Sequence, residues 1–166
     1  MPQEGSQDIN LNPGDFYFGA APIRLRTLLG SCVAITLWHP RLRLGGMCHF
    51  VLPRRTRPRT GALDGHYADE VMDLFMARLR ATGTTPDQYQ AKIFGGGSMF
   101  ELPDTGRAAP TDVFEVAQNN VQSARTLLRQ YGFPVVAEHL GGTGHRNIVF
   151  DIGSGDVWVR HVDTQL

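Results

Sequence analysis

The alternation of apolar and polar positions predicts a chain built largely of short β-strands. Residues 23–29 alternate apolar side chains with Arg24 and Arg26, which is the period of two expected of a half-buried strand. Residues 32–38 form a mostly apolar run that Pro40 ends, because proline cannot donate to a β-ladder. Further strands are expected at residues 14–19, 43–52, 90–94, 135–138, 147–152 and 157–162.

Two longer segments carry the helical period instead. The first helix is expected to begin near Asp69 and to end before Gly83, and the second to span about residues 116–131. Together the elements predict an α/β (α+β) fold, a layered sandwich of mainly antiparallel strands with two principal helices. The apolar stripes of the helices are Val71, Leu74, Phe75 and Leu79 in the first, and Val121, Ala124, Leu128 and Tyr131 in the second.

The predicted domain is a single unit that spans residues 14–166. The length of 166 residues suits one domain. Residues 1–13 lack apolar periodicity and end in Asn12-Pro13, so we interpret them as a flexible lead-in.

Composition narrows the classes of function. Sixteen Lys and Arg residues balance sixteen Asp and Glu residues, so the formal net charge is 16 − 16 = 0, which argues against a nucleic-acid binder. No apolar run approaches the roughly 20 residues that span a bilayer, and the polar N-terminus lacks the order of a signal peptide. Two cysteines cannot form a disulfide scaffold, so we expect a cytoplasmic protein with reduced thiols and no membrane insertion.

The turn before residues 32–38 is the first candidate for chemistry. Cys32 follows Gly30-Ser31 at the start of a buried strand, and free backbone N–H groups at such a turn can stabilise an oxyanion. Residues 33–38 and 47–52 are spaced as a hairpin, which would bring His49 near Cys32 as a base for the thiol. The alternative is that Cys32 is a small core residue and His49 a structural core histidine.

The second thiol is a weaker candidate. Cys48 precedes His49 in the same expected strand, so its side chain points to the opposite face and we assign it to packing. A nucleophilic Cys32 is expected to be alkylated faster than Cys48, with a pH midpoint below that of an ordinary thiol.

Other motifs favour structural roles. Gly95-Gly96-Gly97 follows a strand but lacks the spacing of a phosphate-binding loop, so we interpret it as a turn that allows close approach. The six histidines form no metal-binding motif, and no metal site is predicted. The arginines between residues 54 and 59 predict a solvated loop or, alternatively, a contact for an acidic partner surface.

Several blocks of the sequence resemble the CheD family of chemoreceptor glutamine deamidases. The blocks follow one another in the family's order from about residue 15 to residue 162, nearly the whole chain. They are residues 27–34 (TLLGSCVA), 45–53 (GGMCHFVLP), Tyr67-Ala68-Asp69, residues 91–100 (AKIFGGGSMF) and Gly141-Gly142 followed by Gly144-His145-Arg146.

The resemblance implies a CheD-like fold and a protein-glutamine glutaminase, an amidohydrolase that uses a cysteine nucleophile and needs no cofactor. The family's nucleophile falls on Cys32, its general base on His49 and its catalytic threonine on Thr27. Backbone N–H groups of the Gly30-Ser31 turn would hold the oxyanion, as its placement already indicated.

The resemblance also implies the substrate and the partners. Members of the family hydrolyse particular glutamine side chains on methyl-accepting chemotaxis receptors to glutamate and ammonia. The expected partners are the cytoplasmic region of such a receptor and, as in some relatives, a CheC-like phosphatase. Two rivals stay open on the sequence alone: a non-catalytic adaptor that binds receptors or the phosphatase, and a thiol protease or methylesterase.

Overall fold

The computed structural model describes residues 6–98 and 111–163. Within these ranges nine strands form two sheets, accompanied by two α-helices and the short 3₁₀ helix Pro86–Gln88. Met99 and Phe100, the end of one block of the family resemblance, lie outside the described residues. The first sheet has the order β1(Gln7–Leu11), β3(Ile23–Leu29), β8(His145–Asp151), β9(Val157–Val162), and the second β2(Phe16–Ala20), β5(Leu44–Cys48), β4(Val33–His39), β6(Gln90–Gly95), β7(Val135–Leu140).

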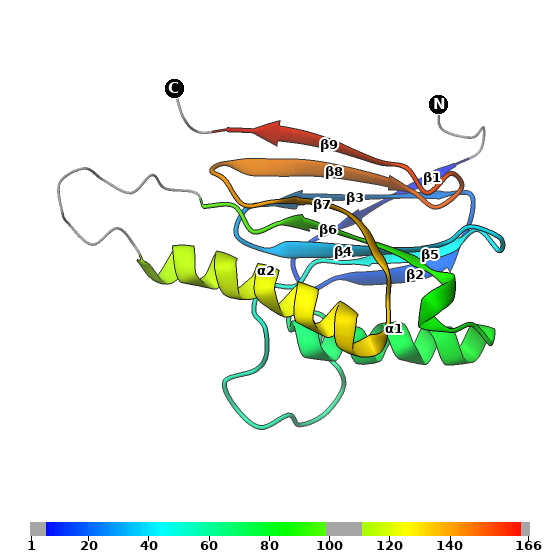
Figure 1. Ribbon diagram of the computed structural model, residues 1–166, viewed down its shortest axis with the longest axis horizontal. Coiled ribbons are helices and arrows are strands. Elements are labelled where there is room, and N and C mark those ends of the chain that lie inside the picture. Colours follow the sequence, from blue (N-terminus) through cyan, green and yellow to red (C-terminus); the bar gives the residue numbers. More distant parts are fainter. Residues whose placement is uncertain (1–5, 99–110, 164–166) are drawn as a thin grey trace.

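The two sheets and the helices form three layers (Figure 1). The second sheet is the middle layer, and α1(Ala68–Thr82) and α2(Thr111–Tyr131) cover its outer face. Five of the seven strand pairings between named strands are antiparallel, while β1–β3 and β6–β7 are parallel. The predicted layered α+β sandwich with two principal helices is therefore confirmed.

One apolar core lies on each face of the middle sheet. Val33, Ile35 and Leu37 of β4 pack with the buried stripes of both helices, whereas Ala34 packs between the two sheets. Because β4 is covered on both faces, it carries an almost continuous apolar run instead of alternating with polar residues.

The helices follow the predicted periodicity except at Leu74, which is only partly buried and is not a member of the core between the helices and the sheet. In α1, Val71, Phe75 and Leu79 are fully buried, and Gly83 ends the helix in the left-handed conformation at φ 68°. The second helix also ends as predicted, before Gly132, but begins at residue 111, five residues earlier than the expected residue 116.

The predicted flexible lead-in is wrong for residues 7–11, which form β1. The strand pairs in parallel with β3 and buries Ile9 and Leu11 against the core between the sheets. On the outer face, the Asp8 carboxylate accepts hydrogen bonds of 2.8 and 3.1 Å from the two arginines of β3. Two apolar side chains in five residues make a pattern too short to register as periodicity, but pairing with β3 stabilises the strand. Residues 1–5 lie outside the described residues.

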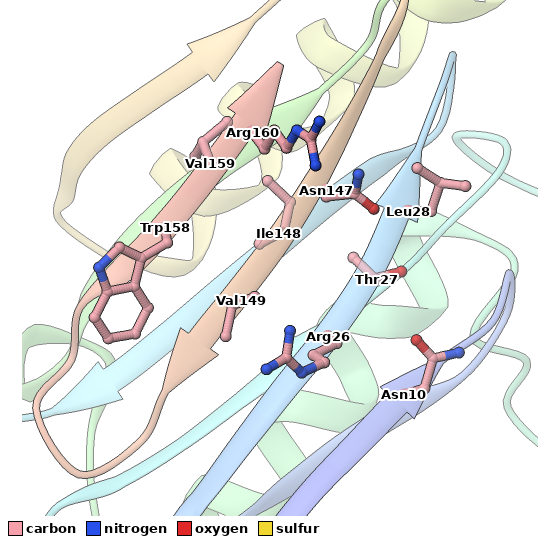
Figure 2. Close-up of a pocket in the computed structure, with 10 residues that line it drawn as sticks. All are labelled: Asn10, Arg26, Thr27, Leu28, Asn147, Ile148, Val149, Trp158, Val159 and Arg160. Carbon is pink, nitrogen blue, oxygen red and sulfur yellow. The ribbon is translucent and has the colours of Figure 1, made fainter. Parts of the chain in front are cut away.

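The outer face of the first sheet carries a shallow groove, shown in Figure 2. The groove has a volume of about 430 Å³ and extends across β1, β3, β8 and β9. Leu28 and Trp158, which line it, are 56% and 45% exposed, and neither Cys32 nor His49 contributes to it. In the described ranges, no helix combines the length and the hydropathy that crossing a membrane requires.

Candidate active site

The hairpin predicted from spacing is confirmed and sets the register around His49. Strand β4 pairs antiparallel with β5, with Thr36 opposite Met47. Past the end of β5 one more bridge joins Val33 to Phe50 through two backbone hydrogen bonds of 3.2 and 3.0 Å. The same register puts His49 opposite residue 34, so it lies diagonally from residue 32. Diagonal neighbours on one face of a sheet are close enough for long side chains to interact.

Cys32 and His49 face the same side of this strand pair. The partly exposed Cys32 packs against the core between the two sheets, the core that also contains Ala34 and Met47. Since side chains alternate along a strand, His49 shares the face of Met47. The sequence prediction that the two side chains meet on one face is consistent with this geometry.

Cys48 points away from the site, as predicted. It is fully buried in the core between the middle sheet and the helices, and the Ile35 N–H donates to its sulfur at 3.4 Å. Burial raises the pKa of the Cys48 thiol to about 12. Both cysteines are free, and only Cys32 is partly exposed.

A threonine of the other sheet fixes the protonation pattern of His49. Thr27 Oγ1 lies 2.6 Å from His49 Nδ1 and donates its single proton to the Leu11 carbonyl at 2.8 Å. Because that proton is already used, the hydroxyl oxygen must accept from His49, so Nδ1 carries the imidazole proton. The lone pair is then on Nε2, which has no hydrogen-bond partner among the described residues.

Burial keeps both members of the thiol–imidazole pair uncharged. Desolvation lowers the pKa of His49 to about 4; the nearby Asp15 carboxylate opposes that change and the nearby His66 adds to it. Burial also raises the pKa of the Cys32 thiol above its ordinary value. The expected low pH midpoint for Cys32 is therefore wrong: at neutral pH the thiol is protonated and the imidazole is neutral.

The turn that carries Cys32 has its carbonyl groups hydrogen-bonded, whereas two of its amides have no acceptor among the described residues. The Gly30 carbonyl accepts from Gly97 N–H and the Cys32 carbonyl from Gly96 N–H, both at 2.9 Å. The Ser31 carbonyl accepts from a side chain of α2 at 3.2 Å. No acceptor among the described residues contacts the Ser31 or Cys32 N–H, so these two donors are available to a bound oxyanion.

The glycine run that begins with the last residue of β6 allows a close approach to the Cys32 turn, as interpreted from the sequence. A Cβ atom on Gly95 would lie 2.3 Å from the Cys32 carbonyl oxygen, and Gly95 has φ 112°. Only glycine allows both this approach and this conformation without strain. The run therefore holds the Cys32 turn.

The arginine-rich loop folds back on α1. Arg55 makes two hydrogen bonds of 2.6 and 2.9 Å to the buried Glu70 carboxylate, and Arg59 pairs with Asp73 at 2.8 Å. The Arg55 hydrogen bonds hold the pKa of Glu70 below its usual range. Two of the arginines are thus engaged within the chain.

Together these features have the form of a thiol hydrolase site. A partly exposed thiol, a buried neutral imidazole with a free nitrogen, and a hydroxyl that orients the ring are the three parts of a nucleophile–base–orienter arrangement. Such a site can transfer an acyl group from an amide to sulfur.

Comparisons with known proteins identify the family. The model of the CheD family, described as "CheD chemotactic sensory transduction", matches residues 51–161, and the chain belongs to this family. It is 52% identical over 157 residues to a protein of Pseudomonas savastanoi pv. phaseolicola named "Probable chemoreceptor glutamine deamidase CheD", a match covering 95% of this chain and 86% of the relative. A similarly named protein of Dechloromonas aromatica is 47% identical over 152 residues, covering 92% and 86%.

Similarity to solved structures is much weaker. The hypothetical protein YfiH of Bacillus licheniformis is 16% identical with a TM-score of 0.46, over 76% of this chain and 51% of that one. The chain thus aligns with about half of the length of that protein.

Proposed function

We propose that this protein hydrolyses the side-chain amide of specific glutamines on chemoreceptors, releasing ammonia and leaving glutamate. Membership of the CheD family and the names of its relatives support the activity. The observation that carries the assignment of residues is the contact of 2.6 Å between Thr27 and His49. It leaves the basic nitrogen of His49 free on the side of the ring away from Thr27.

In the first half of the reaction Cys32 attacks the glutamine carboxamide carbon. His49 Nε2 takes the thiol proton as the C–S bond forms, because neither group is charged beforehand. The N–H groups of Ser31 and Cys32 hold the oxygen that becomes negative; one such donor typically contributes about 100-fold or more in rate. The protonated imidazole then gives its proton to the leaving nitrogen, which departs as ammonia.

In the second half water hydrolyses the γ-glutamyl thioester. Neutral His49 removes a proton from the water as the water oxygen bonds to the thioester carbon. The C–S bond then breaks, and the protonated imidazole returns the proton to sulfur, which restores the Cys32 thiol. The net reaction consumes one water and releases one ammonia for each glutamine converted. None of these steps uses a metal or an organic cofactor.

The proposal includes the partners that the family resemblance implies. The substrate is the cytoplasmic region of a methyl-accepting chemotaxis receptor, which places the protein in the cytoplasm. A CheC-like phosphatase is the second proposed partner.

Incubation of the purified protein with a receptor cytoplasmic fragment tests the proposed activity. Peptide mass spectrometry should detect glutamine-to-glutamate conversion at a few receptor positions, with ammonia released in equal amount. A coiled-coil protein with surface glutamines that is not a receptor is the control and should stay unmodified. Binding of the receptor without any conversion would favour the adaptor instead.

Thr27→Val should lower kcat/KM by about 10- to 100-fold, the effect of losing one buried hydrogen bond. Valine keeps the shape of the side chain but removes the hydrogen bonds that the hydroxyl makes with His49 Nδ1 and with the Leu11 carbonyl. Thr27→Ser keeps the hydroxyl and is the matched control. Steady-state kinetics on the receptor fragment would contradict the orienting role if the two variants were equally active.

A further inference from the structure

We propose that Asn120 of α2 is a positioning residue that locks the Cys32 turn against the segment that follows His49. The inference rests on the proposed function for its kinetic consequence, while its structural part stands on contacts alone. The two hydrogen bonds of this side chain go to the neighbours of the proposed nucleophile and base in sequence, not to Cys32 or His49.

Asn120 is a buried polar residue on an apolar stripe. Between residues 114 and 131 of α2, the buried positions are Ala117, Asn120, Ala124 and Leu128, spaced three or four residues apart as one face of a helix. The Asn120 side chain is 0% exposed. A polar group at such a position destabilises the fold unless it has partners.

The amide nitrogen of Asn120 joins two segments that are distant in sequence. Nδ2 donates to the Ser31 carbonyl at 3.2 Å and to the Val51 carbonyl at 2.9 Å. Ser31 immediately precedes Cys32, and Val51 is two residues after His49. A single side-chain group therefore spans the two loops that carry the proposed nucleophile and base.

The backbone cannot make this link itself. Past the Val33–Phe50 bridge, the next antiparallel partner of the Ser31 carbonyl would be the Leu52 N–H, but that group donates to the His66 carbonyl at 3.1 Å. The β-ladder of this strand pair thus ends at Val33 and does not include Cys32. The Asn120 amide supplies the hydrogen bond to the Ser31 carbonyl that the ladder lacks.

The orientation of the amide follows from its partners. Nδ2 faces two carbonyl oxygens, whereas Oδ1 is buried and has no hydrogen-bond partner in the part of the chain that the structure describes. Rotating the amide would set oxygen against oxygen, so the donor half accounts for the presence of this residue. Because a trans peptide directs its C=O and N–H to opposite sides, the contact that holds the Ser31 carbonyl toward Asn120 also directs the Cys32 N–H, a proposed oxyanion donor, away from α2.

The kinetic test compares Asn120→Ala and Asn120→Asp with Asn119→Ala, a change at the exposed neighbouring asparagine. Both Asn120 variants should lose about 10- to 100-fold in kcat with KM within about twofold of wild type, because the reacting groups are displaced while the receptor surface is unchanged. The Asn119 variant should match wild type. Unchanged kcat in folded Asn120 variants would overturn the inference, whereas inactivity of the wild type would count against the proposed function instead.

A second readout needs no receptor. In the Asn120 variants, iodoacetamide should alkylate Cys32 several-fold faster than in wild type, because the loosened turn exposes the thiol and its pKa falls toward the ordinary value. Cys48 should stay protected, which separates local loosening from unfolding. Equal alkylation of both thiols, or an unchanged rate at Cys32, would contradict the positioning role of Asn120.

The wild-type protein provides a measurement that does not depend on a variant's folding. In an NMR correlation spectrum of side-chain amides, the Asn120 signals should exchange slowly with solvent and shift when Cys32 is alkylated. The Asn119 signals should do neither. Fast exchange at Asn120, or signals insensitive to alkylation, would contradict the link to the turn.

Discussion

Replacing Cys32 by alanine is expected to lower receptor deamidation by about 10,000-fold or more, the scale at which nucleophile removal acts in covalent catalysis. The reason is that no other described thiol can take its place. Cys48 is fully buried on the opposite face of the strand pair, and its pKa is raised to about 12. The measurement is glutamate formation on the receptor fragment by peptide mass spectrometry.

The matched control is Cys48→Ala, which removes a thiol of the same chain. This variant should keep its activity at temperatures where it is folded, although the lost side chain leaves a small cavity in the core. Substantial activity in Cys32→Ala, or loss of activity in folded Cys48→Ala, would show that Cys32 is not the nucleophile.

The second large effect concerns His49 and the pH dependence of the reaction. His49→Gln should lower kcat/KM by about 100- to 10,000-fold, the contribution usual for a general base. In wild type the base is active when unprotonated. Because burial lowers its pKa to about 4, activity should persist well below pH 6.5 and disappear as the pH falls through about 4.

The check is a profile of kcat/KM against pH, with circular dichroism recorded at each pH to show that the fold persists. His49→Gln should lack the acid limb of the profile. A wild-type limb near pH 6.5 would mean that the imidazole titrates as an exposed group and that the uncharged thiol–imidazole pair is wrong.

The sequence pattern sufficed for the parts of the site that depend on one hairpin. Alternation along residues 47–52 put Cys48 and His49 on opposite faces, and the spacing to residues 33–38 put His49 on the side of Cys32. Both statements depend only on the two-residue period of a strand and on antiparallel pairing. The same local logic explains why both helices were found, since their stripes face a single core.

The contacts that tune the site come from elsewhere in the chain and have no local signal. The acceptor of the Thr27 proton is Leu11, in a strand interpreted as a lead-in, and Asn120 is 89 residues from Ser31 in sequence. The position of Asn120 on an apolar helical stripe does not identify its partners, which are distant in sequence. The direction of the Cys32 pKa was missed for a related reason: burial between two sheets is a property of packing, not of the turn sequence.

The family resemblance located Thr27, but only the packing of the two sheets explains how Thr27 reaches His49. Thr27 belongs to the first sheet and His49 follows a strand of the second. Their hydrogen bond therefore joins the two sheets across the core that lies between them. Substitutions in that core can change the rate without touching any of the three reacting or orienting residues.

The first strand of the chain determines which nitrogen of the His49 ring carries the proton. The carbonyl of its last residue, Leu11, accepts the hydroxyl proton of Thr27. The imidazole of His49 must therefore carry its own proton on Nδ1, the nitrogen that faces Thr27. If β1 were trimmed away or displaced, the hydroxyl could donate to the ring and the opposite tautomer would form. The nitrogen facing the thiol would then be an N–H, and under the proposed mechanism His49 could no longer act as the base although the cysteine, histidine and threonine would all remain in place.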